Sequence, residues 1–396
     1  MHSALRVPPV EIRRRIEALQ REMDVLGANA VFIAHRIDLL YFSGCAQNAY
    51  LYVPRVGEPV LLVRRHAPHA ARDSPIAHQV SLASIRDIPE RLAGFDLDIS
   101  GVLGTAWDAL PVREFGLFRR LFPSRAHVDV SGAIHRVRAL KSAWEVERVA
   151  ESARVCEETL DHLRDRARPG MSEAHLAGLS EAFSRRLGHG GGIRVRQPTE
   201  DNRSGWIDEG DDAIPAGRPI ACGFRAVVNG YHAAGCRIFQ EETGSRGDRR
   251  LVRALRDAHA RILYRSGSGT SPADVERAAR SEGCGWNIHG IGLELREPLE
   301  AASPVSSRDL NVCLVLETIT NASAGRTFRL QDTLVVGEEG VRSLRSPVDR
   351  ETGGGGGHPR LASPSSPPPR GEGTCEGMRL DTGIDRSQGE KNGDKP

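Results

Sequence analysis

The sequence of 396 residues has few aromatic side chains and no long hydrophobic run. Aromatic residues make up 5% of the chain. No stretch reaches the roughly 18 apolar residues of a membrane-spanning helix, so such a helix is excluded. The first ten residues lack the basic-then-apolar order of a secretory signal. We therefore expect a cytoplasmic protein with no membrane partner.

Cysteine and lysine are also scarce. The seven cysteines are widely spaced and form no CxxC pair, so neither a disulfide framework nor a zinc knuckle is expected. Only three of the 54 basic residues are lysine, and the arginines are spread along the chain. Because they do not cluster and the formal net charge is only +2, no nucleic-acid partner is expected.

The composition changes sharply near residue 351. Residues 351–396 include five consecutive glycines, followed by a stretch rich in Ser, Pro and charged residues. Such a segment buries too little apolar surface to offset its ordering entropy, so we predict a disordered tail. The preceding chain is long enough for two domains, which we place at 1–138 and 139–350.

The first of these regions has the pattern of an α/β domain. Apolar residues recur with helical spacing over 11–26, and Gly27 follows as a C-cap. Strand-like runs are predicted at four places: 30–34, 39–42, 50–53 and 60–63. Strands alternating with helices indicate an α/β fold.

The second region contains two similar helix–loop–helix units. A long helix is predicted to begin near Ser142, and Ser172 is expected to cap the next helix. Further helices are predicted at 249–264 and 272–282, and strands follow both units. The repeated order suggests a pseudo-symmetric α/β domain, although this order of elements is also common in unrelated proteins.

Several phrases, taken in order, resemble the creatinase/Xaa-Pro aminopeptidase/prolidase family. The main ones are LKSAWEVERVAESARV, IPAGRPIACGFRAVVNGYHAAGCRIF, NIHGIGLELREPLE, VLETIT and FRLQDTLVVGEEGV. The resemblance covers residues 11–348. It implies a small α/β creatinase-type N-terminal domain, a pita-bread C-terminal domain, a homodimer and a small-molecule substrate.

Peptidases of this family bind two divalent metal ions through two Asp, one His and two Glu. The resemblance places these five ligand positions on Gly223, Ala234, His289, Glu317 and Gln331. Only one of the four carboxylates is therefore present, and two adjacent hard cations need several anionic oxygens. We expect no dinuclear metal site and no other cofactor, while one weakly bound divalent ion on His289 and Glu317 is left open.

The remaining polar residues suggest an acid–base site. A His–carboxylate pair is a plausible general base, and we predict this role for His289 with Glu317. Because side chains alternate along a strand, His232 and Cys236 share a face with Ala234. His232 is therefore a third catalytic candidate.

Four residues are candidates for binding the substrate. Arg296 lies in the phrase GLELRE, which is similar to a creatinase phrase, and is expected to clamp a substrate carboxylate. Gln331 and Trp206 are expected to line the site. Cys236 is also a conceivable nucleophile if His232 lowers its pKa, but each of these residues also fits a purely structural role.

Three functions stay open. The first is a metal-independent hydrolase or C–N-cleaving enzyme acting on a small amino-acid- or guanidino-like substrate. The second is an inactive binding protein on the same fold, and the third is a metal-dependent Xaa-Pro aminopeptidase or dipeptidase. Creatine hydrolysis itself is not expected, because the resemblance places creatinase's catalytic His near Trp206 and one of its acids on Cys236.

Overall fold

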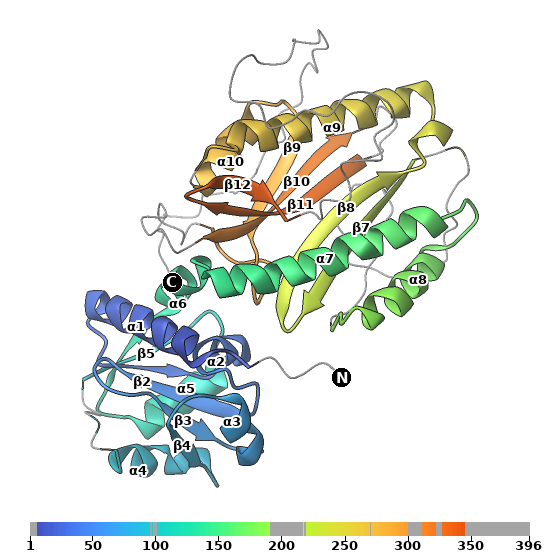
Figure 1. Ribbon diagram of the computed structural model, residues 1–396. Coiled ribbons are helices and arrows are strands. Elements are labelled where there is room, and N and C mark those ends of the chain that lie inside the picture. Colours follow the sequence, from blue (N-terminus) through green and yellow to red (C-terminus); the bar gives the residue numbers. More distant parts are fainter. Residues whose placement is uncertain are drawn as a thin grey trace, which may run out of the picture. The chain divides into compact units, whose positions relative to one another are not determined.

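The structure is a computed structural model that describes most of the chain before residue 345 (Figure 1). The described residues are 6–95, 97, 101–190, 217, 219–269, 271–299, 311–321 and 327–344. The chain separates into Met1–Arg350 and Glu351–Pro396. The predicted disordered tail and Trp206 both lie outside the described residues.

A mixed six-stranded sheet in the order β4-β3-β2-β1-β5-β6 organises the N-terminal part. Its strands are β1 (Ala30–Ile33), β2 (Ala49–Pro54), β3 (Val60–Val63), β4 (His78–Ser81), β5 (Val102–Thr105) and β6 (Ala126–Asp129). The helices are α1 (Pro9–Leu26), α2 (Arg36–Ser43), α3 (Ala67–Asp73), α4 (Ile88–Ala93), α5 (Val112–Leu121) and α6 (Ser131–Ala139). The α/β architecture predicted for this region is confirmed.

Helix α1 shows how the apolar pattern produces this layer. Its predicted stripe, which includes Ile12, Ile16, Leu19 and Met23, is buried. The helix ends at Gly27, whose φ of 66° is a left-handed conformation that glycine adopts without strain.

The strand predicted at 39–42 is wrong, because these residues belong to helix α2. The run Leu39-Leu40-Tyr41-Phe42 is apolar throughout, and such a short run does not distinguish a strand from a buried helix turn. Gly44 with φ 70° ends the helix. Glycine often follows the last residue of a helix, so Gly44 directly after this run was the feature of the sequence that favoured a helix over a strand.

An antiparallel sheet in the order β7-β8-β11-β10-β9 organises the second part, and β12 pairs with β11. Its strands are β7 (Ile220–Val228), β8 (Tyr231–Phe239), β9 (Gly285–Gly290), β10 (Val312–Asn321), β11 (Thr327–Gly337) and β12 (Gly340–Ser343). The helices are α7 (Ala143–Arg166), α8 (Glu173–Arg186), α9 (Arg246–Ser266) and α10 (Pro272–Arg280). Helix α7 begins next to Ser142, as predicted, and the Ser142 side chain caps it. The Ser172 side chain caps α8 as predicted.

Helices α7 and α9 cover the same side of this sheet (Figure 1). Arg237 of β8 contacts both Glu157 of α7, at 2.5 Å, and Asp332 of β11, at 2.9 Å. His259 of α9 lies 3.2 Å from the same Asp332. These contacts assign one face of the sheet to the helices and leave the alternate side chains on the opposite face.

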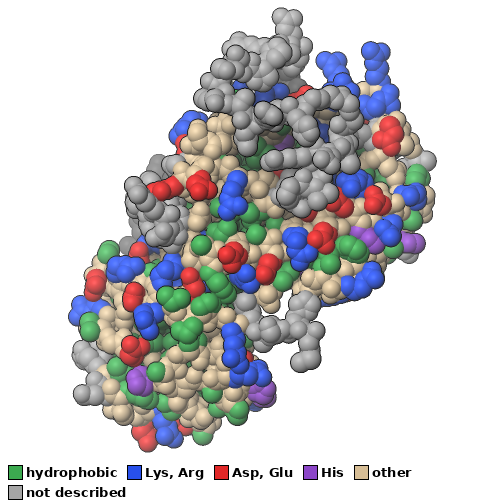
Figure 2. Space-filling model, viewed as in Figure 1, with side chains coloured by type: hydrophobic (Ala, Val, Ile, Leu, Met, Phe, Trp, Pro, Cys, Tyr) green, Lys and Arg blue, Asp and Glu red, His purple; other side chains and the backbone are tan. Residues whose placement is uncertain are grey.

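The described surface carries charges of both signs. Figure 2 shows Lys and Arg side chains interspersed with Asp and Glu over the face in view. No helix in the described ranges is long and apolar enough to cross a membrane. The six described cysteines are free thiols.

Candidate functional site

The strand register brings the aligned positions together on one face of the second sheet. Consecutive cross-strand partners form one row across five strands: Gly223, Cys236, Gln331, Glu317 and Asn287. Directly opposite residues in antiparallel strands share a face. Three of the five family ligand positions therefore lie in one row.

The other two ligand positions lie in the neighbouring row. Ala234 pairs with Arg225, and His289 pairs with Val315. Thr333 links these pairs, because it lies directly opposite Val315 and its Oγ1 accepts a hydrogen bond from the backbone N of Ala234 at 2.9 Å. Since both rows belong to one face, the sequence alignment corresponds to a single site.

This face points away from the helix layer. Along β10 and β11, Glu317 and Gln331 alternate with Thr318 and Asp332. Both Thr318 and Asp332 contact His259 of α9. The side chains of Glu317 and Gln331 consequently project from the opposite face.

The imidazole of His289 is held by the backbone and not by a carboxylate. Its Nδ1 lies 3.0 Å from the carbonyl oxygen of Gly290. A carbonyl only accepts, so Nδ1 donates and Nε2 is left as the proton acceptor. Burial lowers the pKa of His289, and the positive charges of Arg296 and Arg225 lower it further.

Glu317 has a different partner from the predicted one. The guanidinium of Arg329 lies 3.4 Å from its carboxylate. In the described structure Glu317 and His289 are diagonal neighbours on adjacent strands, without a hydrogen bond between them. The prediction that the carboxylate orients the imidazole is therefore corrected: the carbonyl of Gly290 does so.

Cys236 lies in the row of Glu317 but is a poor nucleophile. Its thiol is buried and is 3.4 Å from the carbonyl oxygen of Arg329. Burial raises its pKa to about 12, whereas the nucleophile hypothesis needed a lowered pKa. His232 is four residues away along the same strand, about 13 Å, too far for direct contact.

His232 is associated with the loop that follows β9. Its backbone N–H donates to the carbonyl of Gly292 at 2.8 Å, and its Nδ1 donates to the same oxygen at 3.2 Å. Burial lowers the pKa of His232. The structure thus places His232 on the site face but next to this loop rather than beside Glu317.

The loop is closed by a backbone pair between Gly290 and Glu297. It carries Arg296, which is exposed and makes no ion pair with the described residues. A side chain on Gly292 would meet the Glu297 carboxylate and the Lys141 Cε at 2.8 Å. Glycine at this position therefore allows the loop to pack closely over Glu297.

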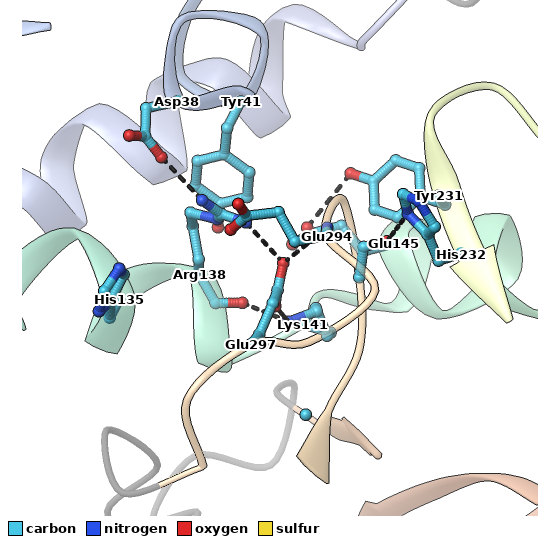
Figure 3. A network of polar contacts seen from close by, with 12 residues as sticks. Asp38, Tyr41, His135, Arg138, Lys141, Glu145, Tyr231, His232, Glu294 and Glu297 are labelled. Atoms are coloured by element: carbon cyan, nitrogen blue, oxygen red, sulfur yellow. Dashed lines mark hydrogen bonds and ion pairs between the residues drawn. The ribbon is translucent and has the colours of Figure 1, made fainter. Parts of the chain in front are cut away.

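A buried ion-pair network anchors this loop, and Figure 3 shows Arg138 at its centre. Arg138 contacts Asp38 at 2.8 Å, Glu294 at 2.7 Å and Glu297 at 2.8 Å. Lys141 lies 2.7 Å from the other oxygen of Glu297. Burial alone would raise the pKa of Glu297, but the charges of Lys141 and Arg138 outweigh it and hold this pKa at about 2.

Two arginines on the site face were missed from the sequence. Arg225 lies directly opposite Ala234, and Arg329 pairs with Glu317. Strand alternation offered a signal, because Arg225 is two residues from Gly223 and Arg329 is two residues from Gln331. Both arginines stand next to positions where the family carries a carboxylate.

The residues at the ligand positions do not fit a dinuclear metal centre. Gly223 and Ala234 offer no donor atom, Gln331 offers a neutral amide, and Glu317 is paired with Arg329. Within the described ranges, no three His, Cys, Asp or Glu side chains converge on a possible metal site. Two hard dications need more anionic oxygen than this face supplies.

Comparison with known proteins identifies the family. Residues 15–140 match the Creatinase/Prolidase N-terminal domain, and residues 147–338 match Metallopeptidase family M24. The chain belongs to the creatinase/prolidase family. The resemblance seen in the sequence and the predicted pita-bread architecture are both confirmed.

Relatives of this family member are distant. An uncharacterized hydrolase/peptidase, y4tL, of Sinorhizobium fredii is 24% identical over an alignment of 330 positions that covers 74% of this chain and 83% of that protein. The Xaa-Pro dipeptidase from Bacillus anthracis is similar in structure with a TM-score of 0.72 at 18% identity, covering 85% of this chain and 98% of the other. For the prolidase from Pyrococcus horikoshii the TM-score is 0.71 at 16% identity, with coverages of 84% and 98%.

Proposed function

We propose that this family member is a metal-independent hydrolase that cleaves a C–N bond in a small amino-acid- or guanidino-like substrate. The proposal rests on the orientation of the His289 imidazole. His289 donates from Nδ1 to a backbone carbonyl, so its Nε2 can accept a proton. The metal-ligand positions on the same face of the sheet are largely neutral. The family match supports hydrolysis of this general kind.

The residues suggest the following division of roles. His289 Nε2 removes a proton from water as the water attacks the carbon of the scissile C–N bond, and then returns that proton to the leaving nitrogen. Arg296 binds an anionic group of the substrate. Glu317, held by Arg329, supplies a negative charge that stabilises the imidazolium formed in the first step.

A substrate panel tests this function. Full-length protein treated with EDTA is incubated with N-acyl, ureido, guanidino and Xaa-Pro compounds, and release of the amine is measured. We expect turnover of at least one compound, unchanged by EDTA, because no step requires a metal ion. Turnover that appears only after addition of Mn²⁺ or Co²⁺ would contradict the proposal and favour a metal-dependent Xaa-Pro peptidase.

The metal-dependent peptidase is a second candidate because the similar structures include an Xaa-Pro dipeptidase and prolidases. An inactive binding protein is the third candidate, favoured by the loss of acidic side chains at Gly223, Ala234 and Gln331. Ligand-induced stabilisation without turnover of any compound would support it. The homodimer and the cytoplasmic location stay predictions from the sequence.

A further inference from the structure

The loop from Gly290 to Glu297 holds the imidazole of His289 through one peptide group. The carbonyl oxygen of Gly290 accepts a hydrogen bond from Nδ1 of His289 at 3.0 Å and another from the backbone N–H of Glu297 at 2.9 Å. A carbonyl oxygen has two lone pairs, so these two donors use both. The N–H of the same peptide group, on Ile291, donates to the carbonyl of Cys313 in β10 at 3.1 Å. The acceptor that faces His289 is therefore fixed from two sides, by β10 and by Glu297.

The side chain of Glu297 fixes the position of this loop. Glu297 is buried, and its two carboxylate oxygens lie 2.8 Å from a guanidinium nitrogen of Arg138 and 2.7 Å from Nζ of Lys141 (Figure 3). The backbone N–H of Glu294 donates to the oxygen that contacts Arg138, at 3.4 Å. Moving the carboxylate would separate it from two buried cations, which is costly. The ion pairs therefore restrain the loop and, with it, the backbone N–H of Glu297.

Lys141 connects this anchor to the strand beside His289. The backbone N–H of Lys141 donates to the carbonyl of Asn311 at 2.6 Å, and the N–H of Asn311 donates back at 2.8 Å. Asn311 directly precedes β10, and His289 lies opposite Val315 of the same strand. The cation that holds Glu297 and the imidazole that Glu297 orients are thus both fixed to β10.

Two glycines allow the loop to close this tightly. A Cβ atom at Gly290 would lie 2.7 Å from the backbone oxygen of Glu297, and one at Gly292 would lie 2.8 Å from the Glu297 carboxylate. The carbonyl of Gly292 accepts from the backbone N–H of His232 at 2.8 Å. The loop is therefore held against β8 as well as β10, and both glycines pack against Glu297.

We propose that Glu297 is a positioning residue for His289. Its buried ion pairs hold the Gly290 carbonyl in place, and that carbonyl keeps the imidazole in the Nδ1–H tautomer, with Nε2 as the proton acceptor. Free histidine in water prefers the opposite tautomer, Nε2–H, so the Gly290 carbonyl must impose this one. Glu297 acts through the loop and does not touch the substrate. The inference deepens the proposed function, on which it rests for the statement that His289 is the general base.

Nuclear magnetic resonance of the full chain, labelled with ¹⁵N-histidine, tests this role. Protonated and unprotonated ring nitrogens differ widely in ¹⁵N chemical shift, so the spectrum reports the tautomer directly. Spectra are recorded at about pH 8.5, well above the ordinary imidazole pKa of about 6.5, so that the rings are neutral. The signals of His289 are assigned by their absence from the spectrum of His289→Asn. We expect His289 of the unmodified protein to be in the Nδ1–H form.

Variants of two glutamates in this loop locate the effect. Glu297→Ala removes the carboxylate, and the milder Glu297→Gln places an amide N–H₂ group against one of the two cations. Each is expected to shift His289 toward the Nε2–H tautomer. For the compound turned over in the substrate panel, each is expected to lower kcat by about 10²-fold, the cost of a small misplacement of a catalytic group, with a smaller change in KM.

Glu294→Gln is the matched control for these variants. Glu294 lies in the same loop, and its carboxylate is 2.7 Å from the same guanidinium of Arg138. This variant therefore removes the same charge from the network but leaves the contacts of Glu297, so the tautomer of His289 and kcat are expected to stay unchanged. Circular dichroism identifies the variants that are folded, and Glu297→Gln replaces Glu297→Ala if the latter is not.

Three results would overturn the inference: an Nε2–H tautomer of His289 in the unmodified protein, an unchanged tautomer in every folded Glu297 variant, or an equal shift in Glu294→Gln. The spectra do not depend on turnover, so their outcome is separable from that of the proposed function. A shifted tautomer in the Glu297 variants, without turnover of any compound by the unmodified protein, would support the positioning role and reject the hydrolase. Turnover by the unmodified protein with the same tautomer in all variants would do the reverse.

Discussion

Replacing His289 with alanine is expected to lower kcat by roughly 10²- to 10⁴-fold, the range found for loss of a general base. The variant loses the Nε2 acceptor that activates water. It also loses one hydrogen bond to the carbonyl of Gly290, which contributes about 1 kcal/mol to stability. The thermal midpoint is therefore expected to fall by only about 2–4 °C, and kinetics with differential scanning calorimetry check both values.

Two further variants separate catalysis from structure. His289→Asn keeps a donor for the Gly290 carbonyl but has no basic nitrogen, so it is expected to be as inactive as His289→Ala and more stable. His175→Ala removes an exposed imidazole on α8 and is expected to change neither kcat nor the thermal midpoint. If His289→Asn turned over substrate at the rate of the unmodified protein, His289 would have no place in the mechanism.

Replacing Arg138 with alanine is expected to lower the free energy of unfolding by about 3–5 kcal/mol, the usual cost of removing one partner from a buried ion-pair network. The change removes a cationic partner from the carboxylates of Asp38 and Glu297, which are 3% and 6% exposed, and leaves them only His35 and Lys141. It also loosens the loop that carries Arg296. Urea denaturation monitored by circular dichroism measures the change.

Arg136 provides the matched control for this variant. It lies on the same helix, and its guanidinium is 2.5 Å from the carboxylate of Glu22 at a partly exposed position. Because exposed ion pairs contribute little, Arg136→Ala is expected to cost about 1 kcal/mol or less. If Arg138→Ala and Arg136→Ala lowered the free energy of unfolding by the same amount, the Arg138 network would not anchor the loop.

The site's framework could be predicted from sequence because it depends on local periodicity. The alternation of side chains along a strand predicts that His232, Ala234 and Cys236 share one face, and all three lie on β8. The alignment of Glu317 and Gln331 likewise corresponds to a direct cross-strand pair. Strand periodicity and phrase order were sufficient for these relations.

The parts that were missed depend on contacts between distant segments. Arg138 and Glu297 are 159 residues apart in the chain, and no local pattern indicates that they meet. The pairing of Glu317 with Arg329 depends on how two strands turn back on each other. The orientation of His289 by Gly290 depends on loop closure, which the phrase HGIG alone does not specify.

The central claim is that the ligand positions of this chain do not hold two divalent metal ions, because Gly223 and Ala234 have no side-chain donor atom and Gln331 is a neutral amide. Isothermal titration calorimetry of EDTA-treated protein with Mn²⁺ tests this claim most directly. The triple variant G223D/A234D/Q331E, which restores all three acidic side chains, is the comparison. We expect no saturable uptake by the unmodified chain and measurable uptake by the triple variant, whereas tight binding of two ions by the unmodified chain would contradict the account.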